Sequence, residues 1–219
     1  MRKLHKYLSL AISVQLLLWT ISGIYFSFNK IEQIRGEHLR STDSYVTELD
    51  FSTLTLPKAE SVEVLSRPSR LIIKIKTNTA EEFFNIDGSK AAPLTKDEAM
   101  SIVRKKTLLN PLKAEKISNP QRGSEYRGRK LPMYKVTTDH KNNVNVYIDE
   151  MSGEIVAIRS SSWRLWDLLW GFHIMDYIDR DNFNNFLIKI FSDFLKIFPR
   201  NHQKLKTKLS FHHSDNYTK

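Results

Sequence analysis

An unbroken apolar run near the N-terminus is the first feature of the chain. Leu8 to Phe28 spans 21 residues without a charged side chain, close to the ~20 that cross a bilayer as a helix. Aromatic side chains gather in its second half, where interfacial anchors are common. The run predicts a transmembrane anchor over residues 1–29. A cleaved signal peptide is the alternative, although its apolar core is usually only ~7–15 residues long.

Two further patterns predict a helix and the strand before it. The segment "RLIIKIKT", residues 70–77, is rich in β-branched side chains and predicts a strand. Thr95 with Glu98 three residues later forms a capping box, and an apolar stripe follows at helical spacing. The helix should end before Asn110-Pro111, because proline disfavours helical geometry in the residue before it.

Alternating patterns predict an antiparallel sheet after this helix. The segments "MYKVTTD" and "NVNVYIDEMSGEIVAI" alternate, with Val144, Val146 and Ile148 on one face and a turn at Met151 to Gly153. The earlier "EEFFNIDGSK" contains Asp87-Gly88, a turn signal. The sequence therefore predicts a small α+β domain over residues 61–160, with a helix, three strands and a β-pair before them. A polar connector, residues 30–60, precedes it.

The C-terminal third mixes aromatic, apolar and charged positions. Residues 161–198 hold a tryptophan-rich segment and then an apolar face at helical spacing from Phe183 to Phe198. Lys189, Asp193 and Lys196 share the opposite face, which favours a helix lying along the membrane surface. The basic tail, residues 199–219, favours instead a return to the cytoplasm.

Charge distribution gives the expected orientation. The formal net charge is +10, and residues 104–141 alone carry eleven Lys or Arg against three Asp or Glu. No compact nucleic-acid-binding signature accompanies this charge, so anionic lipid or an acidic protein is the expected partner. Arg2, Lys3 and Lys6 precede the apolar run. The positive-inside rule then places the N-terminus in the cytoplasm and the domain outside the inner membrane.

Three segments in order resemble one known family. "LTKDEAMSIVRKK", "PMYKV" and "VYIDEMSGEIV" together resemble the PepSY domain, a helix followed by an antiparallel sheet. The opening "RKLHKYLSLAISVQLLLWTISGIYFSF" resembles the membrane helix of PepSY-associated transmembrane proteins, and "LWDLLWGFHIMDY" resembles the segment before their returning helix. The resemblance implies a membrane-anchored extracytoplasmic module that acts as a binding, regulatory or accessory protein. Some larger relatives are associated with iron uptake through haem b held by membrane histidines.

His173 and His5 are the candidate haem ligands. His173 has Asp176 three residues on and is read as a packed or interfacial side chain, as a ligand, or as a catalytic base. His5 lies just before the start of the apolar run, on the side expected to face the cytoplasm. Under the expected topology ~30 Å of hydrocarbon separates the two residues. One chain therefore cannot supply both ligands of one haem.

The remaining candidates are contact residues. The cations of the loop around residues 118–132 and the tryptophans after the domain are expected to contact a partner or lipid: Arg122, Arg127, Arg129, Lys130, Trp163, Trp166 and Trp170. The chain lacks the common hydrolase, metalloprotease and phosphate-loop motifs. We expect a non-enzymatic membrane module without a cofactor that binds a membrane or periplasmic protein. The alternative is a haem-binding subunit of a membrane ferric or siderophore reductase.

Overall fold

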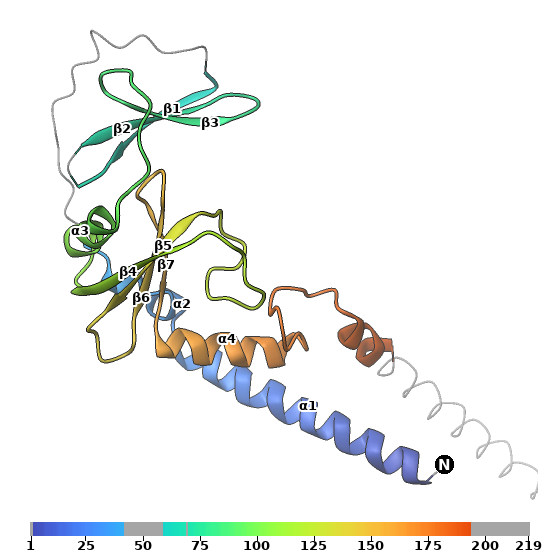
Figure 1. Ribbon diagram of the computed structural model, residues 1–219. Helices are drawn as coiled ribbons and strands as arrows, with labels where there is room; N and C mark the ends of the chain where they lie inside the picture. Colours follow the sequence, from blue (N-terminus) through green and yellow to red (C-terminus); the bar gives the residue numbers. More distant parts are fainter. Residues whose placement is uncertain (1, 42–58, 69, 194–219) are drawn as a thin grey trace, which may run out of the picture. The chain divides into compact units, whose positions relative to one another are not determined.

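The computed structural model describes residues 2–41, 59–68 and 70–193 (Figure 1). The chain divides into two compact units. One unit combines Met1–Ser22 with Leu168–Lys219, and the other is Gly23–Asp167.

Helix α1 (Arg2–Phe28) contains the whole apolar run. Within the described residues, it is the one helix long and apolar enough to cross a membrane, over His5–Phe28. A signal sequence near an N-terminus meets the same criteria of length and composition. The prediction that the apolar run is helical is thus confirmed.

Two antiparallel sheets form the larger unit. The first has the strand order β1-β2-β3, and the second has the order β4-β5-β6-β7. The elements are β1 (Ser61–Ser66), β2 (Leu71–Lys76), β3 (Glu81–Asn85), α3 (Lys96–Lys106), β4 (Pro111–Ile117), β5 (Met133–Thr138), β6 (Asn145–Asp149) and β7 (Ile155–Arg159). The predicted α+β class is confirmed.

Helix α3 begins at the predicted capping box. The Thr95 backbone N–H donates to Glu98 Oε2 at 2.8 Å, and the Glu98 N–H donates to Thr95 Oγ1 at 3.2 Å. Ala99, Ile102 and Val103 are fully buried on the face that packs against the four-stranded sheet. The sheet contributes the predicted alternating positions, since the side chains of Val144, Val146 and Ile148 are buried in the same core.

Two strands were missing from the sequence prediction. Strand β4 lies at an edge of its sheet, so only Ala114 in it is buried and no apolar alternation marks it. Strand β1 is also an edge strand, with Leu65 its one buried residue. Each of these two edge strands buries a single side chain, so its sequence carries a weak periodic signal, whereas the edge strand β7 buries three residues.

The start of the predicted polar connector belongs to the folded unit. Residues 31–39 form a short helix α2 (Ile31–Ile34) and a 3-10 turn η1 (Glu37–Leu39), which bury Ile34 and Leu39. Between them Gly36 has φ +76°, and a Cβ there would come within 2.7 Å of Ile158 Cγ2. This part of the predicted connector is therefore helical and contributes buried side chains. Residues 42–58 of the connector lie outside the described residues.

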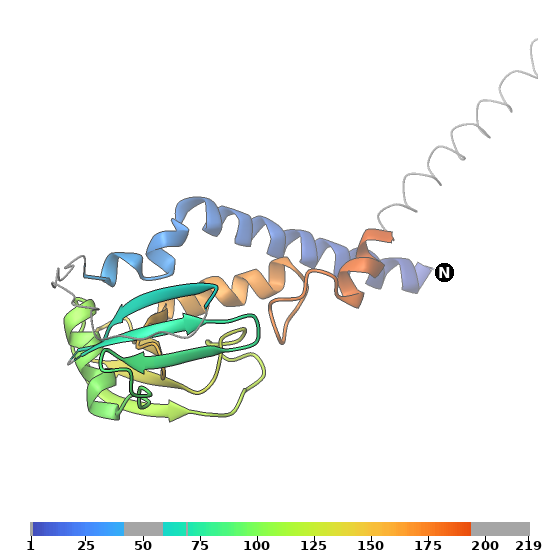
Figure 2. The same cartoon turned by 90° about the horizontal axis from the view of Figure 1, so that it is seen from above.

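The C-terminal part begins with helix α4 (Ser161–His173). A turn follows, and residues 186–193 are helical again (Figure 2). Asn185 caps this helical segment, because its Oδ1 accepts from the N–H of Ile188 at 3.0 Å. The segment thus begins three residues later than the predicted Phe183. Residues 194–198 of the predicted surface helix, and the basic tail, lie outside the described residues.

Candidate functional site

The two buried side chains of helix α1, among those described, are polar, whereas many of its apolar side chains are exposed. Gln15 and Ser22 are 5% and 0% exposed, whereas Leu10, Leu17 and Ile24 are 60%, 58% and 55% exposed. Gln15, Trp19 and Ser22 follow one another at spacings of four and three residues, so they share one helix face. We call this face the polar seam of α1. A helix of a water-soluble protein shows the reverse arrangement, with its apolar stripe buried.

The polar seam binds the end of helix α4. Gln15 Nε2 donates to the carbonyl of Phe172 at 3.0 Å, and Trp19 Nε1 donates to the carbonyl of His173 at 2.7 Å. The last carbonyls of a helix have no partner within the helix. Side chains of α1 therefore complete the hydrogen bonding of α4 at its C-terminus.

His173 lies at the centre of these contacts. Its Nδ1 is 2.8 Å from the hydroxyl oxygen of Ser22. Its ring is parallel to that of Trp170, with centroids 6.3 Å apart, and 6.2 Å from the ring of Trp19. The hydrogen bond and the ring contacts agree with the reading of His173 as a packed side chain.

The turn after α4 is organised around Asp176. Its carboxylate accepts hydrogen bonds from the backbone N–H groups of Asp179, Asp181 and Asn182, at 3.1–3.2 Å. In addition, Tyr177 places its hydroxyl 3.3 Å from Gln15 Oε1. The turn is thus held by its own carboxylate and by the polar seam.

His5 lies far from His173 along α1. Ser22, the hydrogen-bond partner of His173, comes 17 residues after His5 on the same helix, which corresponds to roughly 25 Å. Two axial ligands of one haem must both reach the same iron. The structure therefore agrees with the expectation that one chain cannot supply both histidines. Within the described residues there is also no group of three or more His, Asp or Glu side chains arranged to hold a metal ion.

The basic loop between β4 and β5 is attached to α4 by ion pairs. Arg127 pairs with Asp167, whose side chain is only 3% exposed. Arg164 pairs with Glu125. Burial would raise the pKa of Glu125, but the hydrogen bonds from Arg164 and Tyr147 hold it below the ordinary value. Arg127 is therefore committed to a contact within the domain.

The tryptophans of α4 differ in their surroundings. Trp163 is 8% exposed, with the guanidinium carbon of Arg159 at 4.2 Å from its ring centroid. Trp166 lies against Phe26 near the end of α1, with ring centroids 4.9 Å apart. Trp163 is thus packed within the domain, and lipid contact by Trp166 and Trp170 stays a prediction.

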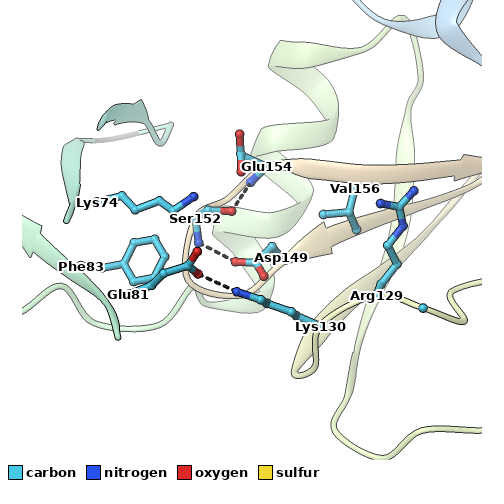
Figure 3. A pocket seen from close by; sticks show the side chains of 10 residues that line it. Lys74, Glu81, Phe83, Arg129, Lys130, Asp149, Ser152, Glu154 and Val156 are labelled. Carbon is cyan, nitrogen blue, oxygen red and sulfur yellow. Dashed lines mark hydrogen bonds and ion pairs between the residues drawn. The ribbon is translucent and has the colours of Figure 1, made fainter. Parts of the chain in front are cut away.

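Three loop residues line a hollow between the two sheets (Figure 3). The hollow has a volume of about 260 Å³ and is lined by Lys74, Glu81, Phe83, Gly128, Arg129, Lys130, Asp149, Ser152, Glu154 and Val156. Lys130 Nζ pairs with Glu81 across it at 2.6 Å. Asp149 accepts from the backbone of the β6–β7 turn, including Ser152 N–H at 2.7 Å. The structure places Arg129 and Lys130 in this hollow and Arg127 outside it, while Arg122 is an exposed residue of the same loop.

The residues that organise these contacts were not among those predicted from the sequence. Gln15 and Ser22 carried a readable signal, because two polar residues seven apart in an apolar run share a helix face. Glu125 and Asp167 carried no such sequence signal, because their partners lie about 40 residues away along the chain.

Comparison with known proteins adds no assignment: no family model, no curated protein and no solved structure matches the chain.

Proposed function

We propose that this protein is a membrane-anchored, non-enzymatic binding module. Helix α1 stays in the inner membrane with its N-terminus in the cytoplasm, and the α+β domain lies on the extracytoplasmic side. There it binds a membrane or periplasmic protein partner, as the resemblance to PepSY modules implies.

The polar seam of α1 is the observation that supports a retained anchor. A cleaved signal peptide leaves the mature protein, so its side chains would have no lasting partners. In contrast, Gln15, Trp19 and Ser22 complete the hydrogen bonds of α4 and its turn. The apolar side chains around them are exposed, as lipid contact requires. Polar groups in a membrane helix usually face other parts of the protein.

Retention of α1 can be tested on membranes of cells that produce the full chain. Alkaline carbonate should leave the protein in the membrane pellet, and N-terminal sequencing should begin at Met1 or Arg2. A sequence beginning after Ser22 would contradict the proposal, as would release of the full chain by carbonate.

The hollow in Figure 3 is the candidate partner surface. It combines the apolar side chains of Phe83 and Val156 with charges from both sheets and the basic loop. A photo-crosslinking amino acid at Phe83 of the full chain should capture a discrete protein in native membranes, and one at exposed Arg104 should not. Equal capture at both positions, or none at Phe83, would contradict this assignment.

A further inference from the structure

Four arginines gather where the basic loop meets α4. Arg159 and Arg127 lie over the ring of Trp163, at 4.2 and 5.8 Å from its centroid. Arg129 follows Arg127 by two residues, and its charge acts on Arg159. Arg164 lies one residue after Trp163. We call Arg127, Arg129, Arg159 and Arg164 the arginine cluster.

The arginine cluster is only partly neutralised by the described part of the chain. Its two carboxylates are Asp167, which pairs with Arg127, and Glu125, which pairs with Arg164. Four positive charges against two negative charges leave +2. Burial, together with the positive charge of Arg129, lowers the pKa of Arg159 to about 10. The guanidinium of Arg159 still carries its charge at neutral pH. An anion bound at the cluster would therefore offset the repulsion between its guanidinium groups.

The position of the cluster in the fold indicates which anion reaches it. Asp167 directly follows Trp166, whose ring lies 4.9 Å from that of Phe26. Phe26 is two residues before the end of α1. Aromatic residues at the end of a membrane helix lie at the level of the lipid headgroups. If α1 is retained, Asp167, the ion-pair partner of Arg127, lies one residue from the side chain that contacts α1 at that level.

We propose that the arginine cluster binds the phosphate of an anionic phospholipid headgroup, with Arg129 as its accessible contact. The guanidinium group suits phosphate because its N–H groups can form two parallel hydrogen bonds. Arg129 is exposed, and no ion pair of its side chain is found within the described residues. The inference rests on the proposed function, since it needs α1 to hold the cluster at the membrane surface.

The test uses the full chain in neutral detergent micelles, with phosphatidylglycerol or phosphatidylcholine added and bound lipids counted by native mass spectrometry. The unchanged protein should retain phosphatidylglycerol in preference to phosphatidylcholine. Arg129→Gln should weaken phosphatidylglycerol binding about fivefold, because one cation at an anionic lipid surface contributes about 1 kcal/mol. Arg129→Lys should restore much of the binding through its point charge. Arg104→Gln is the matched control, because it removes one exposed positive charge from α3.

Several results would overturn the inference. Equal retention of the two lipids would do so, as would equal losses in Arg129→Gln and Arg104→Gln, which would indicate attraction by net charge alone. Binding of an acidic peptide that depends on Arg129, without phosphatidylglycerol binding, would assign the cluster to a protein partner instead. Loss of membrane retention in carbonate would refute the proposed function itself. If the protein stays in the membrane but retains the two lipids equally, only the lipid site is refuted.

Discussion

Two serines of α1 allow the polar seam to be tested with one chemical change. Ser22 is fully buried, and its hydroxyl lies 2.8 Å from His173 Nδ1. Ser13 is exposed, and its hydroxyl donates to the carbonyl of Ser9 in its own helix at 2.9 Å. Ser22→Ala and Ser13→Ala therefore remove the same atom from the same helix, but only the first removes a contact with α4.

The expected difference follows from measured costs of such contacts. Hydrogen bonds between membrane helices contribute about 0.6 kcal/mol on average and at most about 1.7 kcal/mol. Ser22→Ala should lower the free energy of unfolding within that range. Ser13→Ala should change it by less than about 0.5 kcal/mol, as for an exposed substitution without a tertiary contact.

The assay is reversible unfolding of the full chain in mixed micelles, with increasing sodium dodecyl sulfate. Tryptophan fluorescence reports on the site, because Trp19 and Trp170 both lie beside His173. Equal effects of the two substitutions, or a larger effect at Ser13, would refute the seam as the contact that joins α1 to α4.

Four further predictions follow from particular contacts. Gly36→Ala should lower the free energy of unfolding by about 2–4 kcal/mol in a denaturant titration, because left-handed strain adds to overpacking against Ile158. Thr95→Ala should cost about 0.5–2 kcal/mol in the same titration, and no change would mean that the capping box does not stabilise α3. The full chain purified from haem-supplied cells should show no haem absorbance band; a stoichiometric band would restore the reductase alternative. Ile178→Cys gives the cysteine-free chain a single thiol. A membrane-impermeant maleimide should label this thiol only after detergent is added. Labelling in intact vesicles would place the turn at the surface.

The sequence predicted the elements that bury a periodic set of side chains. The capping box of α3 and the alternating strands β5, β6 and β7 are where the patterns placed them, because local bonding and burial agree there. Edge strands β1 and β4 bury one residue each, so tertiary pairing rather than pattern decides them. The role of Gly36 in the connector could not be predicted from the local sequence either, because it depends on Ile158, more than 100 residues away.

The candidate site was predicted in part. His173 and the α4 tryptophans stood out as unusual residue types near the end of the domain. Their partners did not, because the ion pair of Arg127 with Asp167 and the bond of Ser22 with His173 join distant parts of the chain. The basic loop was predicted to contact a partner or lipid, whereas Glu125 and Arg127 attach it to α4. Charge composition alone cannot distinguish a paired arginine from an accessible one.

The depth of the polar seam bears on the segment after α4. Gln15 precedes Phe28 by 13 residues, or about 20 Å along the helix, so a spanning α1 carries Gln15 well below the lipid headgroups. The turn that bonds to Gln15 must then reach the same depth rather than lie along the surface. Irregular backbone is tolerated there only if its polar groups are satisfied within the protein. The carbonyls of Phe172 and Ile174 accept from Gln15 and Asn185 side chains, and Asp176 accepts from the backbone of the turn. These two carbonyls and the Asp176 carboxylate are thus satisfied within the protein, as burial in a membrane would require.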